Sequence, residues 1–133
     1  MLLRTRTSDS VSPITAILWA DVAFEIGVGL LALVIAIVDA HWFGVSRAWL
    51  FGIAAAFGVA AVAIVPIARQ PRAQLVKVLA WGNTLGGAVL WGALAFYWTK
   101  WTPESRGMLA VVADGFVILG VIELFAVRRI AFR

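Results

Sequence analysis

Residues 14–38 read ITAILWADVAFEIGVGLLALVIAIV, and this stretch decides the fold class. A helix needs about 20 predominantly apolar residues to cross the hydrocarbon core of a bilayer, and the stretch exceeds that length. Similar apolar stretches follow at 48–67, 75–98 and 107–127. They lack the alternating period of membrane strands, and only helices satisfy their backbone groups within one segment in lipid. We therefore predict an all-α integral membrane protein, with residues 1–133 forming one antiparallel four-transmembrane-helix bundle.

The composition supports a membrane location. Of 133 residues, 63% are hydrophobic and 14% are charged, and the mean hydropathy is +0.99. A soluble domain carries about 25% charged residues, so this chain has too few polar groups to cover a water-exposed surface. The first apolar stretch is longer than the core of a signal peptide and has no convincing cleavage site, so we expect a retained helix.

The positive charges predict the orientation of the helices. One set of Lys and Arg residues lies in the N-terminal tail, around the connection after 67 and in the C-terminal tail: Arg4, Arg6, Arg69, Arg72, Lys77, Arg128, Arg129 and Arg133. The opposite side has Arg47, Lys100 and Arg106. Lys and Arg accumulate on the cytoplasmic side, so we predict a multi-pass protein of the plasma (inner) membrane with both termini cytoplasmic. We interpret the net charge of +4 as topology signals and contacts with anionic lipids rather than nucleic-acid binding.

Aromatic residues mark the expected interfaces. Amphipathic rings favour the headgroup level, and the residues at the predicted outer end are Trp42, Phe43, Trp49, Phe96, Tyr97, Trp98 and Trp101. Trp19 and Trp81 fall nearer the inner boundary, whereas Trp91 falls inside the third helix. A buried indole N–H needs a partner, so Trp91 is expected to pack toward the bundle or line a cavity. All three are candidate substrate-binding residues.

Glycine and alanine mark places where helices approach closely. Gly82 and Gly86 form a GxxxG pattern in the third helix, beside Gly87, and Gly27 and Gly29 lie in the first helix. Such small residues pack helices within a chain or between copies of it, so a homo-oligomer is possible.

The sequence carries no signal for a metal or cofactor. It has no cysteine, which excludes cysteine-ligated metals and thiol chemistry. It has one histidine, His41, which disfavours a multi-histidine site within one chain. Phosphate-binding glycine loops and hydrolase motifs are absent as well. We predict no cofactor and no metal.

Polar residues inside the predicted helices are the candidate site. Asp21 and Glu25 lie one turn apart in the first helix, Asn83 lies at a similar depth in the third, and Asp114 lies near the centre of the fourth. Ionisable groups at these depths cost roughly 2.5–3.5 kcal/mol, and the distribution of Lys and Arg offers no basic partner deep in the membrane. A cluster joining these helices is geometrically possible. Hydrogen bonds that hold the bundle together are the structural alternative.

Glu123 is nine positions after Asp114, which places it on the opposite face of an ideal helix. It is close to Arg128 and Arg129, so we expect it to form an ion pair at the membrane interface.

Three functions fit these features. The first is an acid/base enzyme or binder for a lipophilic small molecule, of isomerisation, epoxide-opening or cyclisation type, with Glu25 and Asp114 as the acid/base pair. In this reading Asp21 and Asn83 orient the substrate or water. The second is an oligomeric proton-coupled transporter or channel. The third is a non-catalytic accessory subunit of a membrane complex, with mostly helix-to-helix contacts.

Part of the sequence resembles DoxX-like small bacterial four-helix membrane proteins. The similar segments are Glu25–Leu31 (EIGVGLL), Asn83 and Ile122–Leu124 (IEL). The resemblance implies the four-helix membrane fold but no single activity. It also implies a larger role for Glu123 than its spacing suggests.

Overall fold

The chain is all-helical in a computed structural model that describes residues 12–130. Four long helices follow one another: α1 (Pro13–Val38), α2 (Arg47–Arg69), α3 (Ala73–Phe96) and α4 (Pro103–Ile130). Short 3-10 helices, η1 (Ala40–Phe43) and η2 (Trp98–Lys100), lie in two of the connections. Each of the four helices is long and apolar enough to cross a membrane. Of the charged and aromatic residues named above, Arg4, Arg6 and Arg133 lie outside the described part, as do the side chains of Trp42 and Arg129.

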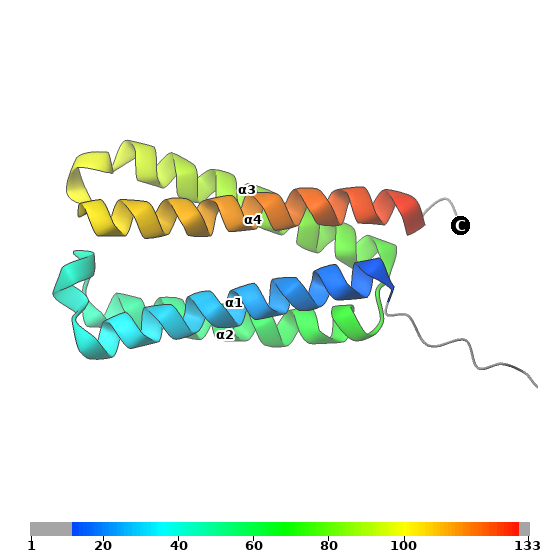
Figure 1. Cartoon of the computed structure of the whole chain (residues 1–133), viewed down its shortest axis with the longest axis horizontal. Coiled ribbons are helices and arrows are strands. Elements are labelled where there is room, and N and C mark those ends of the chain that lie inside the picture. Colours follow the sequence, from blue (N-terminus) through cyan, green and yellow to red (C-terminus); the bar gives the residue numbers. More distant parts are fainter. Residues whose placement is uncertain (1–11, 131–133) are drawn as a thin grey trace, which may run out of the picture.

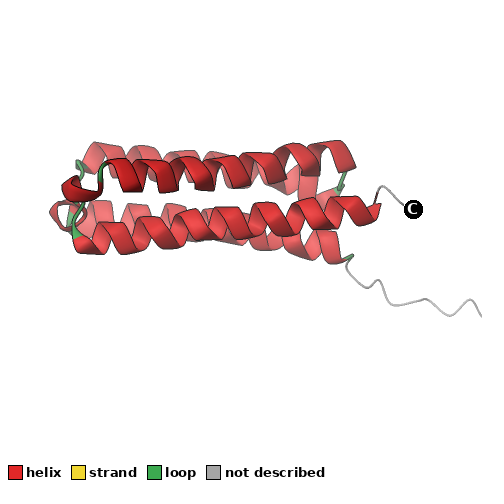
Figure 2. Ribbon diagram, turned by 90° about the horizontal axis from the view of Figure 1, so that it is seen from above, coloured by secondary structure: helices red, strands yellow, loops and turns green. Residues whose placement is uncertain are grey.

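The helices run antiparallel as two hairpins, α1–α2 and α3–α4 (Figures 1 and 2). The two helices of each hairpin are in extensive contact, and α1 also packs against α4, which joins the two hairpins. Both ends of the described chain lie at one end of the bundle (Figure 1), which we call the termini end. The α1–α2 and α3–α4 connections lie at the opposite, loop end.

Local chemistry explains where three helices begin. Ser12 and Ser46 cap α1 and α2, because their side chains accept hydrogen bonds from the backbone N–H groups of Thr15 and Trp49. Thr102 caps α4 through the N–H of Ser105, at 3.2 Å, and Pro103 follows at the first helical position. Proline is favoured there because the missing N–H has no intrahelical partner.

The predicted helix bounds differ from the observed ones mainly in α2 and α4. Pro66 lies inside α2, which continues to Arg69, and the Gln70 N–H still bonds the Pro66 carbonyl at 3.1 Å. The α4 helix begins at Pro103 rather than at 107. Hydropathy placed the start too late because the first turn of this helix is polar. The third helix ends at Phe96, two residues earlier than predicted, because η2 follows.

Glycine sets the closest helix contacts. A Cβ added at Gly87 would lie 2.7 Å from the Ala113 carbonyl oxygen, and one at Gly120 would lie 2.6 Å from that of Ala80. These two positions fix α3 against α4. By contrast, a Cβ at Gly82 or Gly86 would meet nothing within 4 Å, so the GxxxG pattern does not mark a helix contact within the described chain.

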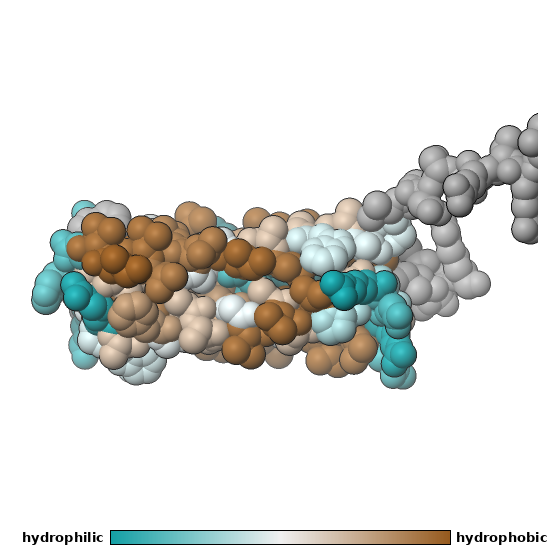
Figure 3. Space-filling view, turned by 90° about the horizontal axis from the view of Figure 1, so that it is seen from below, coloured by the Kyte–Doolittle hydropathy of each residue, from teal (hydrophilic) through white to brown (hydrophobic). Residues whose placement is uncertain are grey.

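The surface is apolar along most of its length. Figure 3 shows brown, hydrophobic side chains over the central part of one face, with hydrophilic residues gathered at both ends. Small apolar clusters lie inside the bundle near each end. At the termini end, Leu18, Ala68, Val76 and Val127 bring all four helices together. At the loop end, the buried Ser105 hydroxyl donates to the Phe43 carbonyl at 2.6 Å and ties η1 to α4.

Candidate functional site

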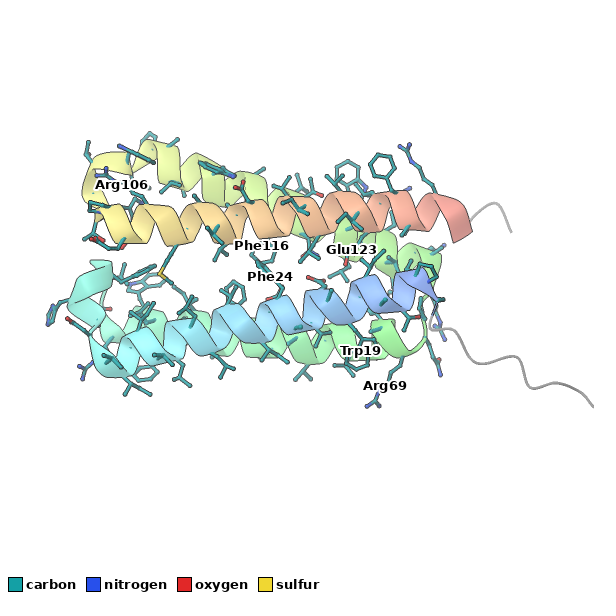
Figure 4. The ribbon with its side chains drawn as sticks, in the orientation of Figure 1. Trp19, Phe24, Arg69, Arg106, Phe116 and Glu123 are labelled. Carbon is teal, nitrogen blue, oxygen red and sulfur yellow. The ribbon has the colours of Figure 1, made fainter. Side chains whose placement is uncertain are left out.

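Four polar residues on three helices are buried between the hairpins: Asp21 and Glu25 of α1, Asn83 of α3 and Glu123 of α4. We call them the carboxyl–amide cluster. They lie between the middle of the bundle and its termini end. Figure 4 shows Glu123 pointing into the space between α1 and α4.

The Asn83 amide joins two of the carboxyls. Its Nδ2 donates to Asp21 Oδ2 at 3.1 Å and to Glu123 Oε2 at 3.2 Å. An amide nitrogen carries two hydrogens, so these bonds use both. The side chain therefore bridges α1 and α4 from its position on α3.

The remaining carboxyl oxygens have no N–H donor, although the Asp21 and Glu123 carboxyls are close enough to hydrogen-bond to each other when one of them carries a proton. Within the described chain, Asp21 Oδ1 and Glu123 Oε1 are buried without a hydrogen-bond partner. Glu25 is 4% exposed, and no described residue donates a hydrogen bond to it. Buried polar groups in proteins are almost always paired, so the cluster depends on carboxyl protons or on a donor group from another molecule.

Basic residues do not compensate for the acids. The described Lys and Arg residues lie in the connections or within five residues of a helix end, and none of these described residues forms a salt bridge to the cluster. Within residues 12–130, no group of three His, Asp or Glu side chains has the arrangement of a metal site. The cluster is chemically suited to holding protons and to accepting hydrogen bonds from a donor group on another molecule.

Three phenylalanines pack beside the cluster toward the loop end. The Phe24 and Phe116 rings meet edge to face with centroids 5.4 Å apart, and Phe57 lies 5.8 Å from Phe116. The Phe24 ring occupies the space that a side chain at Gly115 would need, and this contact helps to join α1 to α4. Figure 4 shows Phe24 and Phe116 pointing toward each other between these helices. The carboxyls thus have an aromatic, apolar neighbourhood on one side.

Asp114, predicted as the partner of Glu25, is not part of this cluster. Its side chain is exposed on the outside of α4, where Oδ1 accepts a hydrogen bond from Trp91 Nε1 at 3.0 Å. The physical reason is the helix period: Asp114 and Glu123 lie on opposite faces, as predicted, but the inward face carries Glu123. The Glu25–Asp114 proximity that we expected is therefore not formed.

The tryptophans expected near a substrate also lie at the surface. Trp19, Trp81 and Trp91 are 41%, 48% and 39% exposed, and Figure 4 shows Trp19 away from the space that holds Glu123. Trp91 has the expected partner for its indole N–H, but that partner is Asp114. Of the predicted site residues, the structure brings together Asp21, Glu25 and Asn83.

Glu123 belongs to the cluster, although its helical spacing led us to expect an ion pair at the membrane interface. Instead of pairing with Arg128 at the helix end, it is fully buried against Asn83, while Arg128 lies over the Phe125 ring. The signal that could have found it is an ionisable side chain within the apolar 107–127 stretch, since such residues rarely face lipid.

Comparisons with protein-family models, with curated proteins and with solved structures gave no match to this chain.

Proposed function

We propose that the chain spans the plasma membrane of a bacterium four times, with both termini cytoplasmic, and that its carboxyl–amide cluster is an acid/base site for a lipophilic small molecule. The four apolar helices and the distribution of Lys and Arg along the chain support the topology. Membrane lipids then surround the bundle, and a hydrophobic ligand reaches the cluster from within the bilayer.

The Glu25 carboxyl, which no described residue satisfies, is the observation that carries the functional proposal. A polar group that served only to hold helices together would be expected to have its partners within the bundle. Here one amide serves two carboxyls, and the Glu25 carboxyl receives no hydrogen bond from the described chain. A ligand that carries a hydroxyl or amine group would supply the missing donors.

The cluster also has what proton transfer requires. One carboxyl in its protonated form delivers a proton to the bound molecule, and a neighbouring ionised carboxyl removes another. A double-bond isomerisation needs no further reactant, because the protons gained and lost balance. Glu25 is placed for transfer, since no hydrogen bond from the described chain competes for it. Asn83 holds Asp21 and Glu123 in place.

A lipophilic carbodiimide tests this proposal without knowledge of the ligand. Dicyclohexylcarbodiimide reacts with protonated carboxyls in apolar surroundings, whereas a water-soluble carbodiimide reaches solvent-exposed ones. We expect peptide mass spectrometry of the protein in lipid vesicles to find Glu25 modified by the lipophilic reagent. The exposed Glu104 should react with the soluble reagent, and it serves as the internal control.

The matched variants are Glu25→Gln and Glu104→Gln. Glu25→Gln should abolish the modification in α1, and Glu104→Gln should leave it unchanged. An extract of membrane lipophiles that contains the ligand should slow the reaction at Glu25. If Glu25 does not react with the lipophilic reagent, or reacts equally with the soluble one, the proposal of a membrane-accessible acid/base site is wrong.

A further inference from the structure

The carboxyl–amide cluster carries acidic groups without a compensating positive charge. It holds three carboxyls, of Asp21, Glu25 and Glu123, and one neutral amide, of Asn83. None of the described Lys and Arg residues forms a salt bridge to it, and all of them lie in the connections or within five residues of a helix end. Asp21 and Glu25 are close enough to repel each other when both are ionised. The cluster therefore attracts a cation and repels an anion.

Glu25 is the member of the cluster that points to a ligand. The Asp21 and Glu123 carboxyls share the Asn83 amide and hydrogen-bond to each other when one of them carries a proton. Glu25 is 4% exposed, and no described residue donates a hydrogen bond to it. A buried carboxylate needs a positive partner, and the described chain supplies none.

We propose that the lipophilic ligand of this site is a primary amine, which binds as an ammonium ion against Glu25. The inference rests on the function proposed above, because it names the chemical class of that site's ligand. A neutral amine reaches the cluster from the bilayer and accepts the proton of the Glu25 carboxyl. The O–H bond breaks, an N–H bond forms, and the products are a carboxylate and an ammonium group. The pair is neutral overall, so no charge crosses the hydrocarbon region.

A primary ammonium group matches the acceptors of the cluster. It carries three N–H donors, and Glu25, Asp21 Oδ1 and Glu123 Oε1 have no N–H donor within the described chain. Side chains one turn apart on a helix have Cβ atoms about 5–6 Å apart. One nitrogen placed between Asp21 and Glu25 therefore lies about 2.7–2.9 Å from an oxygen of each. A hydroxyl group has a single hydrogen to donate, and a quaternary ammonium group has none.

The aromatic rings beside the cluster suit the rest of such a molecule. Phe24, Phe57 and Phe116 come from three different helices and are each half-buried, so part of their ring surface is open to a ligand. Aromatic faces attract cations and also bury apolar groups. The ligand thus has its nitrogen at Glu25 and its apolar chain along these rings, toward the loop end.

Binding to the full chain in lipid nanodiscs tests the ligand class. Radiolabelled dodecylamine is distributed between nanodiscs that carry the protein and empty ones. The competitors are unlabelled dodecylamine, dodecanol, dodecyltrimethylammonium and dodecanoate, which have apolar chains of similar length. We expect saturable dodecylamine binding to the protein. Dodecanol lacks the charge and dodecyltrimethylammonium lacks the N–H donors, so each should compete at least about tenfold less effectively than dodecylamine. Dodecanoate should not compete.

The matched variants are Glu25→Gln, which should lose the saturable binding, and Glu104→Gln, which removes an exposed carboxyl and should keep it. The inference is overturned if dodecanol or dodecyltrimethylammonium competes as strongly as dodecylamine, or if Glu25→Gln retains the binding. It is also overturned if dodecylamine does not bind to a protein whose Glu25 reacts with dicyclohexylcarbodiimide, a result that leaves the acid/base site itself standing. Loss of that reaction as well would overturn both proposals.

Discussion

Replacing Asn83 by leucine should destabilise the bundle by about 2–5 kcal/mol. The substitution removes both hydrogen bonds from Nδ2, to Asp21 at 3.1 Å and to Glu123 at 3.2 Å. Interhelical hydrogen bonds in membrane proteins contribute about 0.6 kcal/mol on average and about 1.7 kcal/mol at most. The larger cost comes from leaving the two accepting oxygens unpaired, at roughly 1–3 kcal/mol each. These oxygens would join Asp21 Oδ1 and Glu123 Oε1, which already lack partners within the described chain.

The triple variant Asp21→Leu, Asn83→Leu, Glu123→Met should behave in the opposite way. Removing one member of a buried polar network leaves the others uncompensated, whereas replacing the whole network by apolar side chains is neutral or stabilising by about 1–4 kcal/mol. We expect the triple variant to be at least as stable as the wild type. This result would indicate that the cluster costs stability, which is typical of residues that are kept for a function.

Reversible denaturation in mixed lipid–detergent micelles, followed by circular dichroism, gives the free energies of unfolding. Leu85→Ala is the control, because Leu85 lies on the same helix with 58% of its surface exposed and should change the free energy little. The reasoning is refuted if Asn83→Leu lies within about 0.5 kcal/mol of the wild type. It is also refuted if the triple variant is less stable than Asn83→Leu alone.

Three further substitutions test the packing that positions the cluster, each by the same unfolding measurement. Gly120→Ala should lower the free energy of unfolding by about 1–3 kcal/mol, because its Cβ would lie 2.6 Å from the Ala80 carbonyl oxygen. Gly82→Ala is its control and should be neutral or stabilising, because an added Cβ there meets nothing within 4 Å. Equal losses of stability in the two variants would contradict this expectation. Phe116→Ala should lower the free energy of unfolding by about 3–5 kcal/mol, because it removes ring contacts with Phe24 on α1 and Phe57 on α2. A loss below about 1 kcal/mol would show that these rings do not join the hairpins. Ser105→Ala should lower the free energy of unfolding by about 1–3 kcal/mol, because the Phe43 carbonyl loses the hydrogen bond that Ser105 Oγ donates at 2.6 Å. A neutral effect would indicate that apolar contacts alone hold the loop end.

The number and positions of the helices could be predicted because each helix is a long and nearly continuous apolar segment. Length and hydropathy alone located four helices, and the errors at Pro66 and Pro103 arose where polar or proline-containing turns continue a helix beyond its apolar part.

The inward faces of the helices were harder to predict. In α4 the helical period correctly separated Asp114 from Glu123 but gave no indication of which face is inward, because both faces of α4 are largely apolar. Tertiary packing decides it: Gly120 must meet α3, and this rotation turns Glu123 inward and Asp114 outward. In α1, Asp21 and Glu25 were found because their i, i+4 spacing already places them on one face.

The glycine pattern failed for a related reason. Gly82 and Gly86 have the spacing of a helix contact, yet the close approach occurs at the neighbouring Gly87. Sequence spacing shows which residues share a face, whereas the partner helix determines which face is used.

The most direct test of the central claim is an experimental structure of the protein in lipid, purified from native membranes without removing bound molecules. We predict a lipophilic molecule whose polar group contacts Glu25 and the unpaired oxygens of Asp21 and Glu123. A dry, filled core in which every carboxyl oxygen of the cluster is hydrogen-bonded to neighbouring helices would contradict the claim and would make the cluster a structural element of the bundle.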